Sequence, residues 1–403
     1  MHLIFLTQVL PYPLDAGPKV RAYYVLRYLA QQHTVTLVSF VRETDTPAAR
    51  VHLATYCRAL HTVPMPRSKL RDGYHLLRSL VNGQPFIIAR DWNYQMVAEL
   101  QRVVANEGPF DAVHADQLWM APYAELVRQW QSQPLRLVLD QHNAVFMIPE
   151  RMAGDDPHPL KRLLLAMEAR KLAHYEVETC QRFDHVTWVT AEDYAAVTAQ
   201  ANGHGPVPNA GIIPICGDVA GQAPIVRRAG PRRITFVGGL HYPPNAQGIC
   251  WFAEKIFGQI LAEAPDVILT VIGKQPPPQL HQLGIPAANL DVPGFVEELE
   301  PYLAETAVFV VPLLAGGGMR VKIIDAWRWG LPIVSTTIGA EGISANPGQH
   351  ILIADTPTAF AQATLSLLHA PEWADTLAQN GRRWLEEAYD WRKVYQRWST
   401  IYP

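Results

Sequence analysis

The chain has 403 residues, of which 49% are hydrophobic and 18% are charged, as expected of a globular protein long enough for two domains. Its formal net charge of −3 gives no electrostatic reason to expect a nucleic-acid-binding protein. The four cysteines stand far apart without CxxC spacing, which argues against a zinc site and favours free thiols in a reducing compartment.

The first ten residues are apolar, but they have no basic lead and run into Pro11 and Pro13. We therefore expect a first strand here and not a secretion signal. No apolar run approaches the roughly 20 residues that a membrane-spanning helix needs. These features predict a cytoplasmic protein, and they leave open a peripheral contact with the inner face of the membrane.

Short β-branched runs alternate with helix-length amphipathic stretches, the pattern of parallel sheets covered by helices. In the first half the expected strands are Leu3–Leu6, Val35–Phe40, Ala112–His114, Leu135–Leu139 and Val186–Val189, and the long expected helices include Lys19–Gln31 and Leu160–Cys180. In the second half the expected strands are Ile234–Val237, Val267–Ile272, Val308–Val311 and Ile333–Ser335, and the expected helices include Asn245–Ala262 and Met319–Trp329. Each half is therefore predicted to be a doubly wound α/β domain, whose ligands bind at the carboxyl ends of the strands.

Pro and Gly concentrate between the halves, where hydrophobic periodicity fades. We therefore predict an N-terminal domain at 1–205, a linker at 206–232 and a C-terminal domain at 233–387. A last helix, about 388–403, is expected to return to the first domain, since the end of the chain is rich in aromatic residues, namely Trp384, Tyr389, Trp391, Tyr395 and Trp398. An exposed helix that binds a partner is the alternative.

A glycine-rich segment after an expected strand carries the clearest functional signal. Gly316, Gly317 and Gly318 are followed by Met319, Arg320, Lys322 and Asp325. Glycines let a ligand approach the backbone, and a helix start offers unpaired N–H groups. Asp325 would lie about 10 Å along the helix axis from Gly318, at ~1.5 Å per residue. This layout suits a nucleotide diphosphate, with the phosphates at the helix start and the ribose near the carboxylate. An ordinary strand-to-helix turn is the alternative.

The same segment, continued through residue 336, resembles the donor-site motif of retaining family-4 glycosyltransferases. Further landmarks stand in the order typical of that family, namely Leu10–Gly17 with Arg21, Phe236–Gly239, Pro243–Asn245, Gly294–Val296 and Gly339–Gly342. The resemblance implies the GT-B fold, in which two Rossmann-like domains face each other across a cleft. It also implies a hexosyltransferase-type enzyme of polysaccharide biosynthesis that uses a UDP- or GDP-linked sugar as co-substrate. The acceptor would be a glycan, lipid-linked or small-molecule hydroxyl, the anomeric configuration would be retained, and neither a metal nor another cofactor would be needed.

The resemblance also assigns roles to residues. His142, just after an expected strand, matches the family histidine that hydrogen-bonds the donor sugar near its reacting carbon. With Arg320 and Lys322, which would hold the leaving diphosphate, it forms the expected catalytic set. The other expected donor contacts are Gly17, Gly238, Gly239, His241, Asn245, Phe295, Val296, Gly316, Gly317, Gly318, Met319 and Asp325. Asp116, Gln117 and Asn143 are the candidates for the acceptor side; for Asp116 and Gln117 a structural role is an equal alternative.

Two departures from the family pattern concern the phosphates. Gly17 is followed by Pro18, which has no N–H to donate. The loop and helix at 237–250 hold no Arg or Lys, although many family members have both there. The cationic contacts should therefore come from Arg320 and Lys322.

A third departure concerns the sugar. Many members of the family have two glutamates seven residues apart, and here Gly317 stands at the first position and Asp325 at the second. Asp325 can still accept hydrogen bonds from ribose hydroxyls. Because the first glutamate would contact the sugar, its loss leaves sugar identity open. Glu341 is one candidate replacement.

A basic segment at 67–78 mixes leucines with Arg67, Lys69, Arg71, His75 and Arg78. It could contact anionic lipid head groups or a lipid-diphosphate acceptor. A solvated helix face is the alternative.

Other activities are less consistent with the sequence. The absence of Asp-x-Asp argues against the metal bridge of the other main transferase fold, and no GxGxxG opens a strand–helix unit as in nicotinamide dehydrogenases. Two functions with the same fold stay open, a sugar-nucleotide epimerase and a non-catalytic sugar-nucleotide-binding protein.

Overall fold

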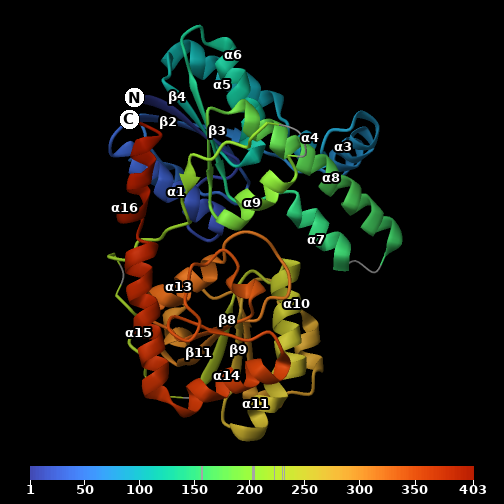
Figure 1. The fold of residues 1–403 in the computed structure, drawn as a ribbon, viewed down its shortest axis with the longest axis vertical. Coiled ribbons are helices and arrows are strands. Elements are labelled where there is room, and N and C mark those ends of the chain that lie inside the picture. The colour runs from blue at the N-terminus through green and yellow to red at the C-terminus, as the bar shows by residue number, and fades with distance from the viewer. Residues whose placement is uncertain (156–157, 202–204, 222, 229, 231) are drawn as a thin grey trace. The chain divides into compact units, whose positions relative to one another are not determined.

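The computed structural model describes residues 1–155, 158–201, 205–221, 223–228, 230 and 232–403. They form two compact units (Figure 1). Unit 1 comprises Met1–Cys216 and Trp391–Pro403, and unit 2 comprises Gly217–Asp390. The division falls inside the stretch expected to be a linker, of which residues 222, 229 and 231 lie outside the described residues.

The sheet of unit 1 is parallel throughout, with the strand order β3-β2-β1-β4-β5-β6-β7. Its strands are β1 His2–Thr7, β2 Thr34–Val41, β3 Ala59–Pro64, β4 Ala112–Asp116, β5 Arg136–Gln141, β6 His185–Trp188 and β7 Gly211–Ile212. Successive residues of β1 point to opposite faces and are buried on both: Leu3 packs in one core cluster, and Ile4 packs in the other.

Helices cover both faces of this sheet (Figure 1). Those described in unit 1 are α1 Gly17–Ala30, α2 Pro47–Ala54, α3 Lys69–Asn82, α4 Phe86–Asp91, α5 Tyr94–Glu107, α6 Ala121–Trp130, α7 Met147–Asp155, α8 Pro159–Arg182, α9 Ala191–Ala199 and α16 Trp391–Val394, with 3₁₀ turns at Leu118–Met120 and Tyr395–Thr400. Within the described ranges of the whole chain, no helix is long and apolar enough to cross a bilayer.

The sheet of unit 2 is also parallel, with the strand order β10-β9-β8-β11-β12-β13. Its strands are β8 Arg233–Val237, β9 Ile268–Ile272, β10 Leu290–Gly294, β11 Thr306–Val311, β12 Ile333–Ser335 and β13 Leu352–Ile353. The described helices are α10 Pro243–Trp251, α11 Phe257–Glu263, α12 Glu300–Ala304, α13 Val321–Trp329, α14 Pro357–His369 and α15 Pro371–Ala388, with a π-helical stretch at Phe252–Ile256 and 3₁₀ turns at Pro278–Gln282, Ala287–Asn289 and Ile338–Ala340.

Both sheets reverse their strand order at one point, between β1 and β4 in unit 1 and between β8 and β11 in unit 2. In open α/β sheets, ligands bind outside the carboxyl ends of the strands at this point. The expected fold class, two doubly wound parallel α/β domains, is confirmed.

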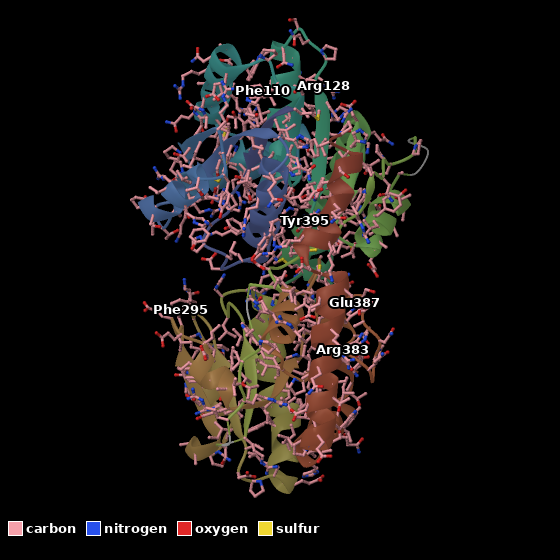
Figure 2. All side chains as sticks on the ribbon, turned by 90° about the vertical axis from the view of Figure 1, so that its left-hand side faces the viewer. Phe110, Arg128, Phe295, Arg383, Glu387 and Tyr395 are labelled. Carbon is pink, nitrogen blue, oxygen red and sulfur yellow. The ribbon has the colours of Figure 1, made fainter. Side chains whose placement is uncertain are left out.

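The end of the chain, Trp391–Pro403, belongs to unit 1. Trp391, Tyr395 and Trp398 are buried in a core cluster of unit 1 together with residues of α1. Tyr395 is labelled in this terminal segment in Figure 2. In place of one helix over 388–403, this segment has the short helix α16 Trp391–Val394 and the 3₁₀ turn Tyr395–Thr400.

Candidate functional site

Two glycine loops of unit 2 lie at the carboxyl ends of β8 and β11. Gly238 follows β8, and a Cβ atom placed on it would lie 3.0 Å from Lys322 Nζ and 3.1 Å from Asn245 Nδ2. Gly316 and Gly318 follow β11 with φ angles of 124° and 71°, a backbone conformation that favours glycine. The glycines therefore permit the close approach of two loops at the point where the strand order reverses.

Lys322 of α13 reaches the glycine loop after β8. Its Nζ donates a hydrogen bond of 2.7 Å to Asn245 Oδ1 and lies 4.4 Å from the centre of the Phe236 ring. Asn245 in turn donates through Nδ2 to the carbonyl of Gly239 at 2.9 Å. Burial, reinforced by the positive charge of Arg320, lowers the pKa of Lys322 to about 7. An anion bound beside Nζ would raise that pKa again, because it favours the charged ammonium.

Arg320 is buried and binds protein groups. Its Nη1 donates to the carbonyl of Gly317 at 2.6 Å, its Nε donates to that of Ile338 at 3.2 Å, and its Nη2 lies 3.3 Å from the Glu341 carboxylate. The guanidinium thus fixes the glycine loop to the turn after β12. The expected contact between Arg320 and a phosphate stays a prediction, and so does the proposed role of Glu341 as a replacement acid.

The expected helix Met319–Trp329 begins later than predicted. Helix α13 starts at Val321, and Arg320 is its N-cap. The left-handed φ of Gly318 interrupts the helical backbone, so the glycines and the buried Met319 form a loop ahead of the helix. The N–H groups at the helix start are therefore those of α13 from Val321 onward, not those near Gly318.

The remaining donor candidates of unit 2 differ in exposure. Asp325 is half-buried and forms an ion pair with Arg328, with 2.9 Å between Asp325 Oδ1 and Arg328 Nη2. Burial raises the pKa of the Asp325 carboxyl group. His241 is exposed, and Val296 is half-buried. Phe295 is 61% exposed and projects from the loop after β10 (Figure 2).

Sequence reasoning missed Lys274, which follows β9. The N–H of Leu240 donates to its carbonyl at 3.0 Å, so it lies beside the glycine loop after β8. Its exposed Nζ lies 4.6 Å from the centre of the Phe295 ring. A lysine two residues after a buried strand was the available signal. The cations at this edge of unit 2 therefore include a lysine outside the stretch 237–250.

In unit 1, the polar candidates gather at the carboxyl ends of β4 and β5. His142 Nε2 donates to Asp116 Oδ1 at 2.9 Å. Asp140 lies 3.8 Å from the same nitrogen and accepts two hydrogen bonds from Arg21, of 2.9 and 2.8 Å. Among the residues that the structure describes, His142 Nδ1 and Asp116 Oδ2 have no hydrogen-bond partner. The strand ends thus bring together two predicted residues, Asp116 and His142.

The charges in this cluster are set by burial and pairing. Burial alone would lower the pKa of His142, but Asp116 and Asp140 outweigh it and raise that pKa to about 9. Burial raises the pKa of Asp116, and His142 opposes the shift. Burial also acts to raise the pKa of Asp140, but Arg21 and the hydrogen bonds hold it well below its usual range. His142 is therefore an imidazolium at neutral pH, with Nδ1–H available to donate.

The other candidates of unit 1 lie in the adjoining loops. Gly17 is the first residue of α1 and is half-buried, and Pro18 follows it in the first turn. Gln117 is buried with a φ of 72°, and its N–H donates to the carbonyl of Asp140 at 3.0 Å. Asn143 is half-buried directly after His142.

The loop that carries His142 is held by a residue that the sequence did not reveal. Glu176 of α8 is buried and accepts hydrogen bonds from Gln141 Nε2 at 2.8 Å, from the N–H of Val145 at 3.0 Å and from the N–H of Phe146 at 3.2 Å. Burial raises the pKa of Glu176 to about 8. A single glutamate in a long helix has no motif around it, so only the folded chain identifies this contact.

A match to a known protein family lies within unit 2. Residues 231–370 match the family model of Glycosyl transferases group 1. This stretch contains both glycine loops, Asn245 and Lys322, together with the other donor candidates of unit 2.

A curated relative, the "Uncharacterized 44.6 kDa protein in cps region" of Klebsiella pneumoniae, is 31% identical over 169 residues. That match covers 40% of this chain and 44% of the relative, so the chain spans less than half of the relative's length.

Several solved structures are similar over the whole chain. HepE of Anabaena, in complex with UDP and glucose, has a TM-score of 0.68 at 14% identity, covering 100% of this chain and 99% of that one. Sucrose-phosphate synthase of Thermosynechococcus elongatus has a TM-score of 0.69 at 17% identity, covering 100% and 98%. WaaG, a glycosyltransferase involved in lipopolysaccharide biosynthesis, has a TM-score of 0.65 at 14% identity, covering 99% of each chain. At this identity the likeness concerns the fold, and it confirms the GT-B class.

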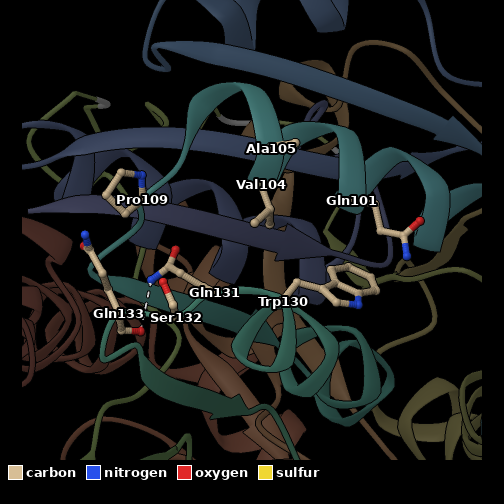
Figure 3. Close-up of a pocket in the computed structure, with 8 residues that line it drawn as sticks. All are labelled: Gln101, Val104, Ala105, Pro109, Trp130, Gln131, Ser132 and Gln133. Atoms are coloured by element: carbon tan, nitrogen blue, oxygen red, sulfur yellow. Dashed lines mark hydrogen bonds between the residues drawn. The ribbon is translucent and has the colours of Figure 1, made fainter.

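One pocket of unit 1 is lined by none of the candidate residues (Figure 3). It has a volume of about 390 Å³ and is lined by Gln101, Val104, Ala105, Pro109, Trp130, Gln131, Ser132 and Gln133. Gln131 uses its amide to bind the backbone N–H and carbonyl of Phe110, at 2.8 Å each. The lining has no ionisable side chain, and we assign it no role in catalysis.

Proposed function

We propose that the protein is a glycosyltransferase that takes its sugar from a nucleotide diphosphate. The observation that carries this proposal is the position of Lys322, whose Nζ is held by Asn245 beside the glycine loop after β8, at the strand-order reversal of unit 2 and inside the stretch that matches the glycosyltransferase family model. A uridine nucleotide is the first candidate, since HepE structures have been solved with UDP and with UDP-glucose.

Departure of the diphosphate develops negative charge, which an enzyme must stabilise where it appears. In this proposal Lys322 contacts the phosphates, and the glycine loops supply backbone N–H groups. Lys274 adds a second charge from the end of β9. Arg320 acts mainly by holding the loop of Gly316–Gly318 in shape, through its bonds to two carbonyls and Glu341.

We further propose that transfer proceeds with retention and without a metal. The bond between the anomeric carbon and the diphosphate oxygen breaks, the acceptor oxygen bonds to that carbon on the same face, and the acceptor proton passes to the departing phosphate oxygen. Asp116, the carboxylate beside His142, is bound to the imidazolium, which disfavours a role for it as a nucleophile. His142 positions the sugar through Nδ1–H.

A hexose is the proposed sugar, and the proposed acceptor is a hydroxyl of a glycan or a lipid-linked saccharide in polysaccharide biosynthesis. The description of WaaG as an enzyme of lipopolysaccharide biosynthesis supports this acceptor class.

Calorimetric titration of the full chain with UDP, GDP and their glucose conjugates tests the donor site. We expect UDP to bind, and Lys322→Ala to weaken binding at least tenfold. Lys255→Ala is the matched control, because Lys255 is an exposed lysine of unit 2 that forms an ion pair with its neighbour Glu254. Equal affinity in Lys322→Ala and the wild type, with both folded, would refute the phosphate site.

Mass spectrometry of products from a panel of sugar nucleotides and acceptors tests the reaction. We expect release of the nucleotide diphosphate to depend on the acceptor. Turnover of the donor without an acceptor would indicate an epimerase, and tight donor binding without any turnover would indicate a non-catalytic binding protein.

A further inference from the structure

Helix α3 turns an apolar face to the solvent. Leu70, Tyr74, Leu77 and Val81 are 87%, 60%, 68% and 89% exposed. Their spacing of four, three and four residues places them along one face of a helix. Among the side chains of this helix that the structure describes, the buried one is the polar Ser79, at 1% exposure. The amphipathic helix thus has its apolar side outward, the reverse of the usual surface helix.

The first half of α8 also exposes apolar side chains. Leu160, Leu163 and Met167 are 69%, 57% and 36% exposed and follow one another at helical spacing. Lys171 of α8 donates a hydrogen bond of 3.2 Å to the hydroxyl of Ser79, so the two helices are neighbours. Figure 1 shows α3, α4 and α8 on the same side of unit 1. We call residues 69–82 and 159–171 together the α3–α8 surface.

Positive charge surrounds these apolar side chains. Residues 69–82 and 159–171 include seven Lys and Arg and two acids, although the whole chain carries a formal net charge of −3, and five of these cations, Lys69, Arg78, Lys161, Arg162 and Arg170, are exposed among the side chains that the structure describes. Lys69 and Arg78 are exposed on either side of the apolar face of α3. In α8, Lys161, Arg162 and Arg170 are exposed. One of the two acids, Glu168, accepts a hydrogen bond of 3.3 Å from the N–H of Ile87 in α4. Its carboxylate is therefore partly engaged with α4.

This composition favours one occupant over the alternatives. An exposed apolar face flanked by cations is the pattern of a helix that lies in the interface of an anionic bilayer. A two-fold dimer through the same surface would oppose these five exposed cations with five cations, because such an interface pairs a patch with itself. A face meant only for water would expose charged or polar groups and not four large apolar side chains.

We propose that the α3–α8 surface docks peripherally on a membrane of anionic phospholipid. Leu70, Tyr74, Leu77 and Val81 enter the headgroup region, and Lys69, Arg78 and the cations of α8 contact the lipid phosphates. The contact brings the protein to acceptors carried on lipid, but it does not depend on sugar transfer. Its test therefore uses no nucleotide, and its failure would leave the proposed glycosyltransferase activity standing.

The experiment is flotation of the full chain with vesicles of phosphatidylglycerol and phosphatidylcholine, at low and at high salt. We expect the protein to float with the anionic vesicles at low salt and much less with pure phosphatidylcholine. Each cation near an anionic surface is worth about a fivefold change in partition, so Lys69→Gln/Arg78→Gln should bind roughly 25-fold more weakly. Leu70→Ser/Leu77→Ser should lose flotation without any change of charge.

Matched controls come from the rest of the chain. Lys255→Gln/Arg383→Gln removes two exposed cations of unit 2, and Val51→Ser removes an exposed apolar residue of α2 that is 69% exposed in the wild type. Both should float like the wild type. Absence of flotation at low salt, or equal loss in the controls, would overturn the proposal. A dimer in light scattering that only the α3 variants abolish, without vesicle binding, would overturn it in favour of self-association.

Discussion

The Nζ atom of Lys322 donates a hydrogen bond to Asn245 Oδ1 across 2.7 Å, which joins α13 to the first turn of α10. The two residues lie 77 positions apart, and the bond is part-buried. A lysine held in this way keeps its ammonium fixed at the end of β8. Because its pKa is lowered to about 7, its charge is easily lost in the absence of an anion.

We therefore predict that UDP affinity falls as the pH rises above about 7. Below this pKa Lys322 is already charged, and above it binding must take up a proton, at a cost of up to about tenfold in affinity per pH unit until the pKa of the complex is reached. Calorimetry in buffers of different ionisation enthalpy at pH 8 should show the proton uptake. Lys322→Arg should bind without this uptake. An affinity that is constant from pH 6 to pH 9 in the wild type would contradict the assignment.

A second prediction concerns the buried pair of Arg21 and Asp140. Both side chains are fully buried, and Asp140→Asn leaves Arg21 without its counter-charge. Removing one partner of such a pair typically costs about 3–5 kcal/mol. We expect the free energy of unfolding of unit 1, measured by urea denaturation, to fall by this amount in Asp140→Asn. Asp266→Asn, which breaks an exposed pair with Arg232, should change stability by less than about 1 kcal/mol. Equal losses of stability in Asp140→Asn and Asp266→Asn would contradict the prediction.

A third prediction concerns Asp116 as a positioning residue for His142. The raised pKa of His142 means that the charged pair stabilises the fold below the ordinary histidine pKa and that this contribution is lost as the pH rises through about 9. Asp116→Asn should therefore lower the pKa of His142, measured by NMR titration of its ring carbon. Asp72→Asn, in α3, should leave it unchanged. If the pKa of His142 stayed near 9 in Asp116→Asn, the pairing with Asp116 would not be what keeps His142 charged.

The fourth prediction tests the loop held by Glu176. In Glu176→Gln, an amide nitrogen replaces one of the oxygens that accept from Gln141, Val145 and Phe146. We expect the free energy of unfolding to fall by about 1–3 kcal/mol, because a buried N–H donor is left without an acceptor. A shift of the His142 ring signals should accompany it. Glu178→Gln lies two residues away on an exposed part of the helix and is the control. Unchanged His142 signals in Glu176→Gln would contradict the positioning role.

The sequence by itself determined the fold class. The buried parallel strands, such as β1, β9 and β11, are nearly continuous apolar runs that need no tertiary information to be recognised. The strands that were missed, β3, β7, β10 and β13, include both edges of each sheet. They have no fully buried apolar run.

The sequence also placed the glycine loops and Lys322 after the correct strands, since the position of a loop along the chain is a local property. The tertiary structure alone decided which partners the charged side chains take. Arg320 binds carbonyls and Glu341, His142 pairs with Asp116, and Lys274 lies beside the loop after β8, a loop in which the sequence has no cation. Each of these partners is brought close by packing between segments distant in the chain, and hydrophobic periodicity does not encode such distances.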